Sequence, residues 1–181
     1  MLIFICIIII ILLYILFFYN SLIKLNNNVK EAFSTMDVYL KKRWDLIPNI
    51  VETIKGYTKY EAATLEKIVT LRNINYNLLS EEEKIKENTN LNNEINKFMV
   101  LAENYPNLKA SENFKDLNNS LTKVEDEIAN SRKYYNATVR IFNNKIEIFP
   151  NNILAKIFGY KRKNMFELDN KNETNKINVK L

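Results

Sequence analysis

The sequence predicts an all-α protein in which an N-terminal transmembrane helix is followed by a long antiparallel bundle of about four helices. Residues 1–19 form an uninterrupted apolar run, and the 181-residue chain has only two glycines and three prolines. After the apolar run, large apolar side chains recur at spacings of three and four, which is the period of a packed helix. Because the predicted connections are short, neighbouring helices are expected to run antiparallel.

Composition excludes several classes of function. The chain contains no histidine, which rules out histidine-dependent nucleophilic sites and histidine-bound zinc or haem. Two glycines are too few for a phosphate-binding loop, and the single Cys6 cannot form an internal disulfide. Carboxylates alone can do acid–base chemistry, but nothing in the sequence places two at a useful separation. We therefore expect no enzyme, no catalytic residue, no cofactor and no metal.

The apolar run at residues 1–19 predicts a membrane anchor. It carries no charge, and as a helix it is roughly 28 Å long, close to the ~30 Å hydrocarbon core of a bilayer. A secretory signal is the alternative, but the run has neither a preceding basic residue nor a small-residue cleavage pattern. Lys24 and Lys30 follow the run and no Lys or Arg precedes it, which favours a cytoplasmic bundle, an external N-terminus and a single pass through the cell membrane.

The first helix after the anchor is predicted over residues 20–55. Its apolar stripe runs from Val29 to Ile54 and passes through Pro48 without losing phase. A proline inside a helix removes a hydrogen bond and kinks the axis, so we expect one kinked helix ended by Gly56. The alternative is a second helix that starts at Pro48.

Two shorter helices are predicted next. One covers residues 58–79, with Thr58 as N-cap and a stripe of Tyr60, Leu65, Ile68 and Leu71. The other begins with a capping box, in which Ser80 caps the helix and Glu83 reaches back. It ends at residues 104–106, and its stripe consists of Leu91, Ile95, Phe98 and Ala102.

The fourth helix has the clearest pattern. From Phe114 to Ile146 its apolar positions step by three and four, a heptad-like seam about 50 Å long that Pro150 closes. The apolar run at 153–160 is expected to pack on the end of the bundle, and the polar stretch 169–181 to be disordered. The predicted domains are therefore an anchor at 1–19, a helical bundle at 20–160 and a polar, disordered tail at 161–181.

Several stretches in this order resemble the LemA family of bacterial membrane-anchored helical proteins. They are YNSL at 19–22, VKEAF at 29–33, KRWDLIPNIVETIKGY at 42–57, AENYPNLKA at 102–110, EIANSRKYYN at 127–136 and the region 149–160. Trp44 and the short, lysine-rich tail depart from the family's pattern. The resemblance implies an N-terminal anchor and an antiparallel bundle, and it implies no assigned activity or cofactor.

Six polar residues near breaks in the apolar pattern are candidates for a polar cluster. They are Arg43, Asp45, Asn49, Glu103, Asn104 and Arg132. The favoured interpretation is a structural one, in which the cluster fixes the alignment of neighbouring helices. The alternative is that these side chains line a groove for a partner.

The predicted function is that of a non-enzymatic scaffold or adaptor, anchored in the bilayer through residues 1–19 and binding protein partners of unidentified kind. Homo-oligomerisation is left open. The alternative is a sensor of a small molecule or signal, with a polar pocket between helices. A nucleic-acid partner is not expected, since the net charge of +5 is spread along the chain.

Overall fold

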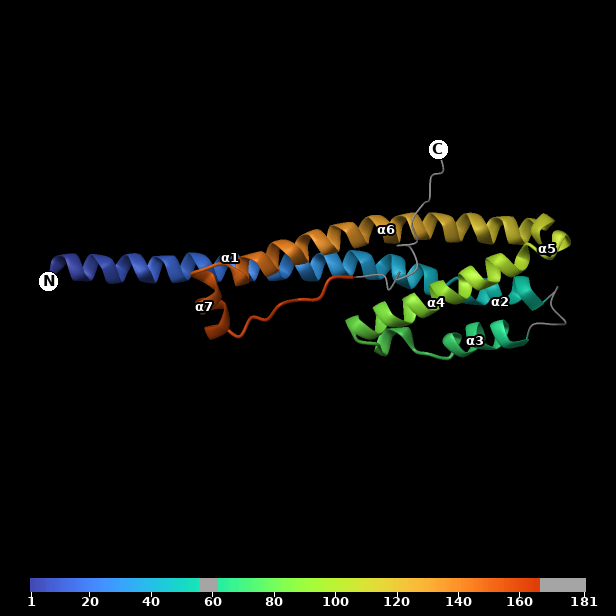
Figure 1. Cartoon of the computed structure of the whole chain (residues 1–181), viewed down its shortest axis with the longest axis horizontal. Helices are drawn as coiled ribbons and strands as arrows, with labels where there is room; N and C mark the ends of the chain where they lie inside the picture. Colours follow the sequence, from blue (N-terminus) through green and yellow to red (C-terminus); the bar gives the residue numbers. More distant parts are fainter. Residues whose placement is uncertain (56–61, 167–181) are drawn as a thin grey trace, which may run out of the picture.

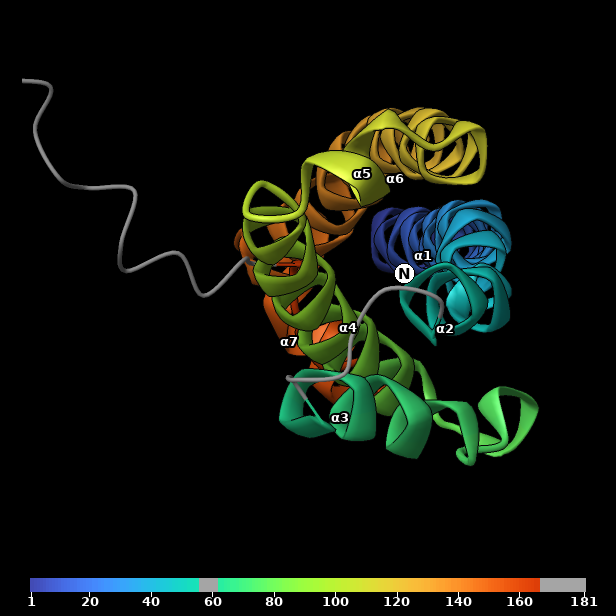
Figure 2. The ribbon, with the colours of Figure 1, turned by 90° about the vertical axis from the view of Figure 1, so that its right-hand side faces the viewer.

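The all-α prediction is confirmed. The computed structural model describes residues 1–55 and 62–166, and these ranges contain helices and connections but no β-strand. Two long helices, α1 and α6, run antiparallel, and the shorter α2, α3 and α4 pack at the end farthest from the N-terminus (Figure 1). Viewed along the long axis, α4 lies beside α1 and α6, and α3 lies on its outer side (Figure 2).

Helix α1 joins the apolar run to the bundle without a break. It extends from Leu2 to Trp44, 43 residues in all. Its side chains up to Phe17 are largely exposed, whereas Phe18 and Leu22 are buried. From there the predicted stripe faces α6 and α4, with Val29, Phe33, Met36 and Leu40 in the core. The N-terminal part of α1 therefore projects alone beyond the bundle (Figure 1).

The expected kink at Pro48 is a short break that lies just before the proline. Helix α1 ends at Trp44, two turn residues follow, and α2 spans Ile47–Lys55. Pro48 has no N–H, and its ring clashes with the carbonyl four residues earlier, which belongs to Trp44. The chain nevertheless keeps its direction, and the stripe continues through the buried Ile47, Ile50 and Val51.

The second predicted helix is shorter than expected. Helix α3 spans Ala62–Arg72, and a 3₁₀ turn, η1, follows at Tyr76–Leu78. The side chain of Asn75 accepts a hydrogen bond from the N–H of Asn77 at 3.2 Å, a local bond that competes with helix continuation. The predicted cap and stripe residues Thr58 and Tyr60, the side chain of Leu65 and the predicted end at Gly56 lie outside the described residues.

The predicted capping box opens α4, which spans Glu81–Ala102. The hydroxyl of Ser80 accepts from the N–H of Glu83 at 3.3 Å, and the Glu83 carboxylate accepts from the N–H of Ser80 at 2.8 Å. These bonds to Ser80 hold the pKa of Glu83 below its usual value. The whole predicted stripe of α4 is buried.

Helix α6 contains the predicted seam. It spans Glu112–Glu147 and follows a short helix, α5, at Pro106–Ala110. Ser111 caps α6 by accepting from the N–H of Phe114 at 3.3 Å. Phe114, Leu117, Leu121, Ile128, Tyr135, Phe142 and Ile146 are buried along it, and Val139 takes the buried place next to the half-buried Thr138.

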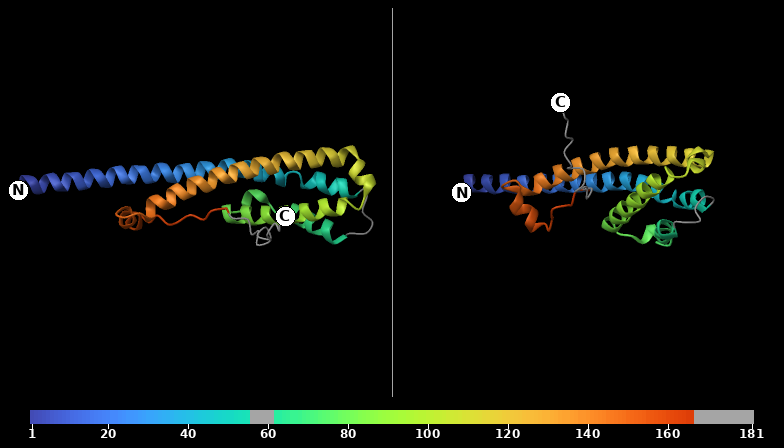
Figure 3. Two further views of the ribbon diagram at one scale, coloured as in Figure 1. Left: turned by 45° about the horizontal axis from the view of Figure 1, so that its top comes forward. Right: turned by 45° about the vertical axis from the view of Figure 1, so that its right-hand side comes forward.

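The C-terminal segment folds back beside both long helices (Figure 3). Helix α7, Asn151–Ile157, lies next to α1, and Gly159 ends it with a φ of 74°, a value that favours glycine. The expected packing of the run 153–160 is only partial, because Ala155 is buried while Ile153 and Ile157 point to solvent. Residues 161–166, where the predicted tail begins, lie along α6 and are hydrogen-bonded to it, and the rest of the predicted tail falls outside the described ranges.

Candidate functional site

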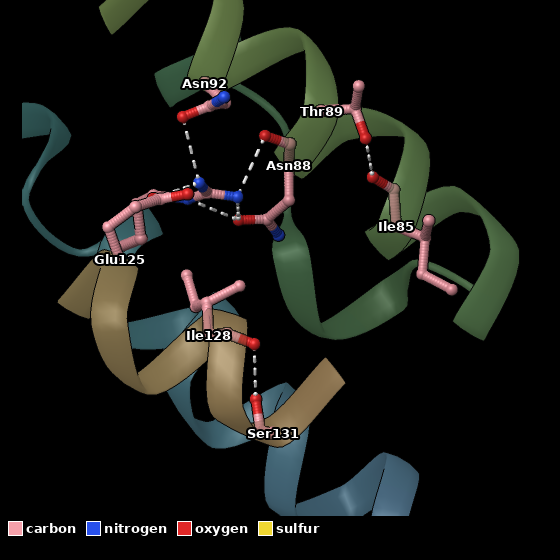
Figure 4. A network of polar contacts seen from close by, with 8 residues as sticks. Ile85, Asn88, Thr89, Asn92, Glu125, Ile128 and Ser131 are labelled. Atoms are coloured by element: carbon pink, nitrogen blue, oxygen red, sulfur yellow. Dashed lines mark hydrogen bonds and ion pairs between the residues drawn. The ribbon is translucent and has the colours of Figure 1, made fainter. Parts of the chain in front are cut away.

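The most extensive polar arrangement of the described residues surrounds Arg43. The last turn of α1 holds this side chain in the core, where only 3% of the residue is exposed. Its Nη1 donates to Oε2 of Glu125 on α6 at 2.7 Å and to Oδ1 of Asn92 on α4 at 3.2 Å. Its Nη2 donates to the main-chain oxygen of Asn88 at 3.1 Å. Figure 4 shows Asn88, Asn92 and Glu125 converging from the two helices.

A second group of contacts extends this network toward the surface. The fully buried Asn88 donates through Nδ2 to the main-chain oxygen of Lys84 at 3.1 Å and, at 3.4 Å, to the hydroxyl of Tyr76. That hydroxyl donates to Oδ1 of Asp37 at 2.7 Å, and Lys84 pairs with Oδ2 of Asp37 at 2.6 Å. The "Arg43 network" is defined here as Asp37, Arg43, Tyr76, Lys84, Asn88, Asn92 and Glu125.

The charges of the Arg43 network compensate one another. Two cations, Arg43 and Lys84, face two carboxylates, Glu125 and Asp37, each at hydrogen-bond distance. Burial lowers the pKa of Arg43, and the adjacent Glu125 opposes that effect. The buried cation is therefore paired and hydrogen-bonded, and its bonds link α1 to α4 and α6.

The six predicted candidates do not form one cluster. Arg43 and Arg132 share an environment around Glu125, which acts electrostatically on both guanidinium groups. Arg132 stacks over the ring of Phe166, 4.7 Å from its centroid, and burial lowers its pKa. The other four candidates, Asp45, Asn49, Glu103 and Asn104, are exposed, and Asp45 pairs with Lys41. Whether any of the six binds a partner stays a prediction.

Asn49 lies instead in an open cleft of about 330 Å³ between α2 and α6. The cleft is lined mainly by polar side chains: Asn49, Glu52, Thr53, Asn113, Asp116 and Ser120, with Leu46 and Leu117.

Sequence reasoning missed most members of the Arg43 network, although one of them, Asn88, left a signal in the sequence. Asn88 extends the stripe of α4 backward by three residues from Leu91, and a polar residue in phase with a buried stripe signals a buried polar contact.

Tyr76 makes the stability of this site depend on pH. Burial, reinforced by the bond to Asp37, raises the pKa of its hydroxyl well above the usual value of 10. Above about pH 10 the unfolded chain therefore loses this proton while the folded protein keeps it, so stability falls as the pH rises. We expect Tyr76→Phe to flatten the decline in unfolding free energy between about pH 9 and pH 11, measured by urea titration.

The matched control for this pH experiment is Tyr134→Phe, which alters an exposed tyrosine outside the Arg43 network. The control should decline like the unchanged protein. Equal slopes for the two variants would contradict a role for the Tyr76 proton. Burial also raises the pKa of Tyr135. Part of the decline in stability with pH should therefore remain in Tyr76→Phe.

These features define a class of protein: an all-α helical hairpin whose first helix extends as an exposed apolar segment and whose core contains a charge-compensated polar network. The chain belongs to the LemA family, whose sequence model matches residues 32–181.

Named relatives show how far the similarity extends. The chain is 29% identical over 140 residues to "Protein LemA" of Metamycoplasma hominis, covering 75% of this chain and 63% of that protein. It is 36% identical over 75 residues to "Magnetosome protein MamQ 2" of Paramagnetospirillum magneticum, covering 41% of this chain and 28% of the relative. "Magnetosome protein MamQ" of Magnetospirillum gryphiswaldense is 34% identical over 74 residues, with coverage of 41% and 27%. The chain thus spans less than two thirds of each of these relatives.

Proposed function

We propose that this LemA-family protein is a membrane-anchored, non-enzymatic scaffold or adaptor that presents a rigid helical rod to protein partners on the cytoplasmic side of the cell membrane. The observation that carries the proposal is the continuity of α1. Its N-terminal part is long and apolar enough to cross a membrane, and it passes into the buried face of the bundle without a break. A partner on the bundle would be held at a fixed distance and direction from the bilayer.

The contacts of the Arg43 network support a structural role over a reactive one. Each of its charged groups is engaged by another group of the same chain, and Glu125 and Lys84 are the direct partners of Arg43 and Asp37. Groups held in this way add rigidity between helices. Rigidity is the property that a scaffold requires.

Deletion of residues 2–17 tests the anchor. The full chain is expected to remain in the membrane pellet after a high-pH wash, whereas the shortened chain is expected in the supernatant, because the deleted side chains are the exposed apolar ones. Replacement of residues 2–17 by an unrelated apolar helix of the same length is the control and should restore the pellet. A shortened chain that withstands the wash would refute anchoring by α1.

A photo-crosslinking side chain at Val100 or Leu78 tests for partners. Both residues are exposed apolar positions on the bundle, so an inserted crosslinker should not disturb the core. Irradiation of intact cells should give adducts of discrete mass with a different protein, absent when the crosslinker replaces the buried Leu91. An adduct of twice the chain's mass would show self-association, and adducts with lipid alone would contradict the adaptor role.

A sensor with a polar pocket is the second candidate, favoured by the cleft that contains Asn49. Native mass spectrometry of the protein released from its own membranes should then show a bound small molecule. Ser120→Leu, on the wall of the cleft, should abolish the bound mass. An unliganded mass in the unchanged protein would count against the sensor.

A further inference from the structure

We propose that α7 and the turn before it insert into the surface of the bilayer that α1 crosses and form an apolar collar beside the anchor. The inference rests on the anchoring proposed above and adds a second, separate contact with lipid. The collar is defined by five exposed large apolar residues: Ile148, Phe149, Ile153, Ile157 and Phe158.

The exposed apolar run of α1 ends at the level where other parts of the chain begin to pack against it. The unbroken run of outward-facing side chains ends near Phe17, since Phe18 is only 3% exposed, whereas Tyr19 is 40% exposed and its ring contacts that of Phe158. As a helix, residues 2–17 measure roughly 24 Å, against a hydrocarbon core of ~30 Å. The last turn of a membrane-spanning α1 therefore lies at the edge of the apolar layer, and elements that pack beside that turn lie at the same level.

Helix α7 lies at this level. The hydroxyl of Tyr14 donates to Oδ1 of Asn151 at 2.7 Å, and the ring of Tyr19 is 4.9 Å from that of Phe158. These contacts place α7 beside the last turns of the exposed run, where the membrane boundary falls (Figure 1). The collar is therefore continuous with the apolar surface of the anchor.

The chemistry of the collar matches a lipid surface. Ile153 is 54% exposed and Ile157 70% exposed, and their spacing of four places them on one side of α7. Phe149 is 75% exposed nearby. Such a concentration of large apolar groups within eleven consecutive residues differs from the singly scattered ones that are normal on protein surfaces.

Basic side chains lie next to the collar. Lys156 is an exposed residue of α7, and the exposed Lys161 and Arg162 follow it, with Arg162 paired to Glu147 at 2.9 Å. A short apolar surface bordered by Lys and Arg is typical of segments that lie in the membrane interface, where cations meet anionic headgroups. We therefore assign the lipid bilayer as the occupant of this surface.

The test uses the full chain with Cys6→Ala and one introduced cysteine that carries an environment-sensitive fluorophore. Ile157→Cys probes the collar, Ile8→Cys probes the anchor, and Val100→Cys probes an exposed apolar position at the distant end of α4. The protein is reconstituted into vesicles of phosphatidylcholine and phosphatidylglycerol, with or without a spin-labelled lipid that quenches fluorescence near the headgroups.

At position 157 we expect blue-shifted emission that loses most of its intensity with the spin-labelled lipid, while emission at position 100 is unchanged. A fluorophore at 157 that behaves like the one at 100, while the one at position 8 is shielded from water, overturns the collar and leaves the anchor intact. Shielding from water at 157 without quenching by lipid also overturns it, because a protein surface then covers α7. Loss of shielding at position 8 overturns the anchor, and the collar with it.

Discussion

Replacement of Arg43 by methionine is expected to lower the free energy of unfolding by about 3 kcal/mol. Methionine retains an unbranched apolar stem but removes the guanidinium, and with it the bonds to Asn88, Asn92 and Glu125. Asn88 is fully buried, so its freed acceptor cannot be satisfied by bulk water. Glu125 is about half exposed and can be hydrated, which keeps the loss at the lower end of the range for a broken buried pair.

Urea unfolding of the full chain in detergent micelles, followed by circular dichroism, measures this effect. The matched control is Lys42→Met, which makes a similar change at the next residue, where the side chain is exposed and lies over the ring of Tyr39. That exposed contact contributes about 0.5–1 kcal/mol. Equal losses in the two variants would show that the Arg43 network does not hold the helices together.

Periodicity made the long helices predictable. In α4 and α6 every third or fourth side chain is buried by a neighbouring helix. The sequence of each helix therefore shows the pattern of burial without knowledge of its neighbours. The early end of α3 depended instead on a local competitor, the bond within Asn75–Asn77. Local bonds of this kind do not change the spacing of apolar residues. Because the chain is rich in asparagine, the asparagine that ends a helix cannot be told from the others.

The partners of Arg43 could not be deduced in the same way. Arg43 was selected from its position beside the apolar stripe, and it is buried as a polar cluster requires. Asn92 and Glu125 are far from it in sequence and meet it only when α4 and α6 pack against α1. Asp45 and Asn49 were selected from their closeness to Pro48, but both residues are exposed there and neither joins the Arg43 network.

The extended segment 161–166 was also missed, because its binding depends on a match between the residue spacing of a helix and that of an extended chain. Asn136 and Asn143 lie two turns apart on α6, or roughly 10.5 Å. Residues 163 and 166 are three positions apart in an extended chain, roughly 10 Å. Each asparagine amide can therefore bond both main-chain groups of one residue. In the sequence, Asn136 looks like part of an accidental glycosylation triplet, Asn136-Ala137-Thr138.

The double variant Asn136→Ala, Asn143→Ala is expected to release this segment from α6. Asn143 donates to the main-chain oxygen of Lys163 at 2.8 Å and accepts from its N–H at 2.9 Å. Asn136 makes the same pair of bonds with Phe166, at 3.0 and 2.8 Å. At about 0.5–1.5 kcal/mol for each bond, the four bonds stabilise the closed segment by roughly 2–6 kcal/mol.

Hydrogen exchange at the amides of Lys163 and Phe166 measures the release. Both should exchange orders of magnitude faster in the double variant, while the amides of the buried Leu117 and Leu121, near the other end of α6, keep their protection. Asn144→Ala, at an exposed position of the same helix, is the control and should leave the two amides protected. Unchanged exchange at Lys163 and Phe166 in the double variant would mean that other contacts hold the segment.

Release of the segment should also reach the Arg43 network, because Phe166 is buried and its ring covers the guanidinium of Arg132. Without that ring Arg132 gains water, and the burial that lowers its pKa is reduced. Arg43 repels and Glu125 attracts the charge of Arg132, and hydration of Arg132 weakens both effects. We therefore expect the loss caused by Arg43→Met to differ measurably between the unchanged background and the double asparagine variant, and additive losses would show that the extended segment and the network act independently.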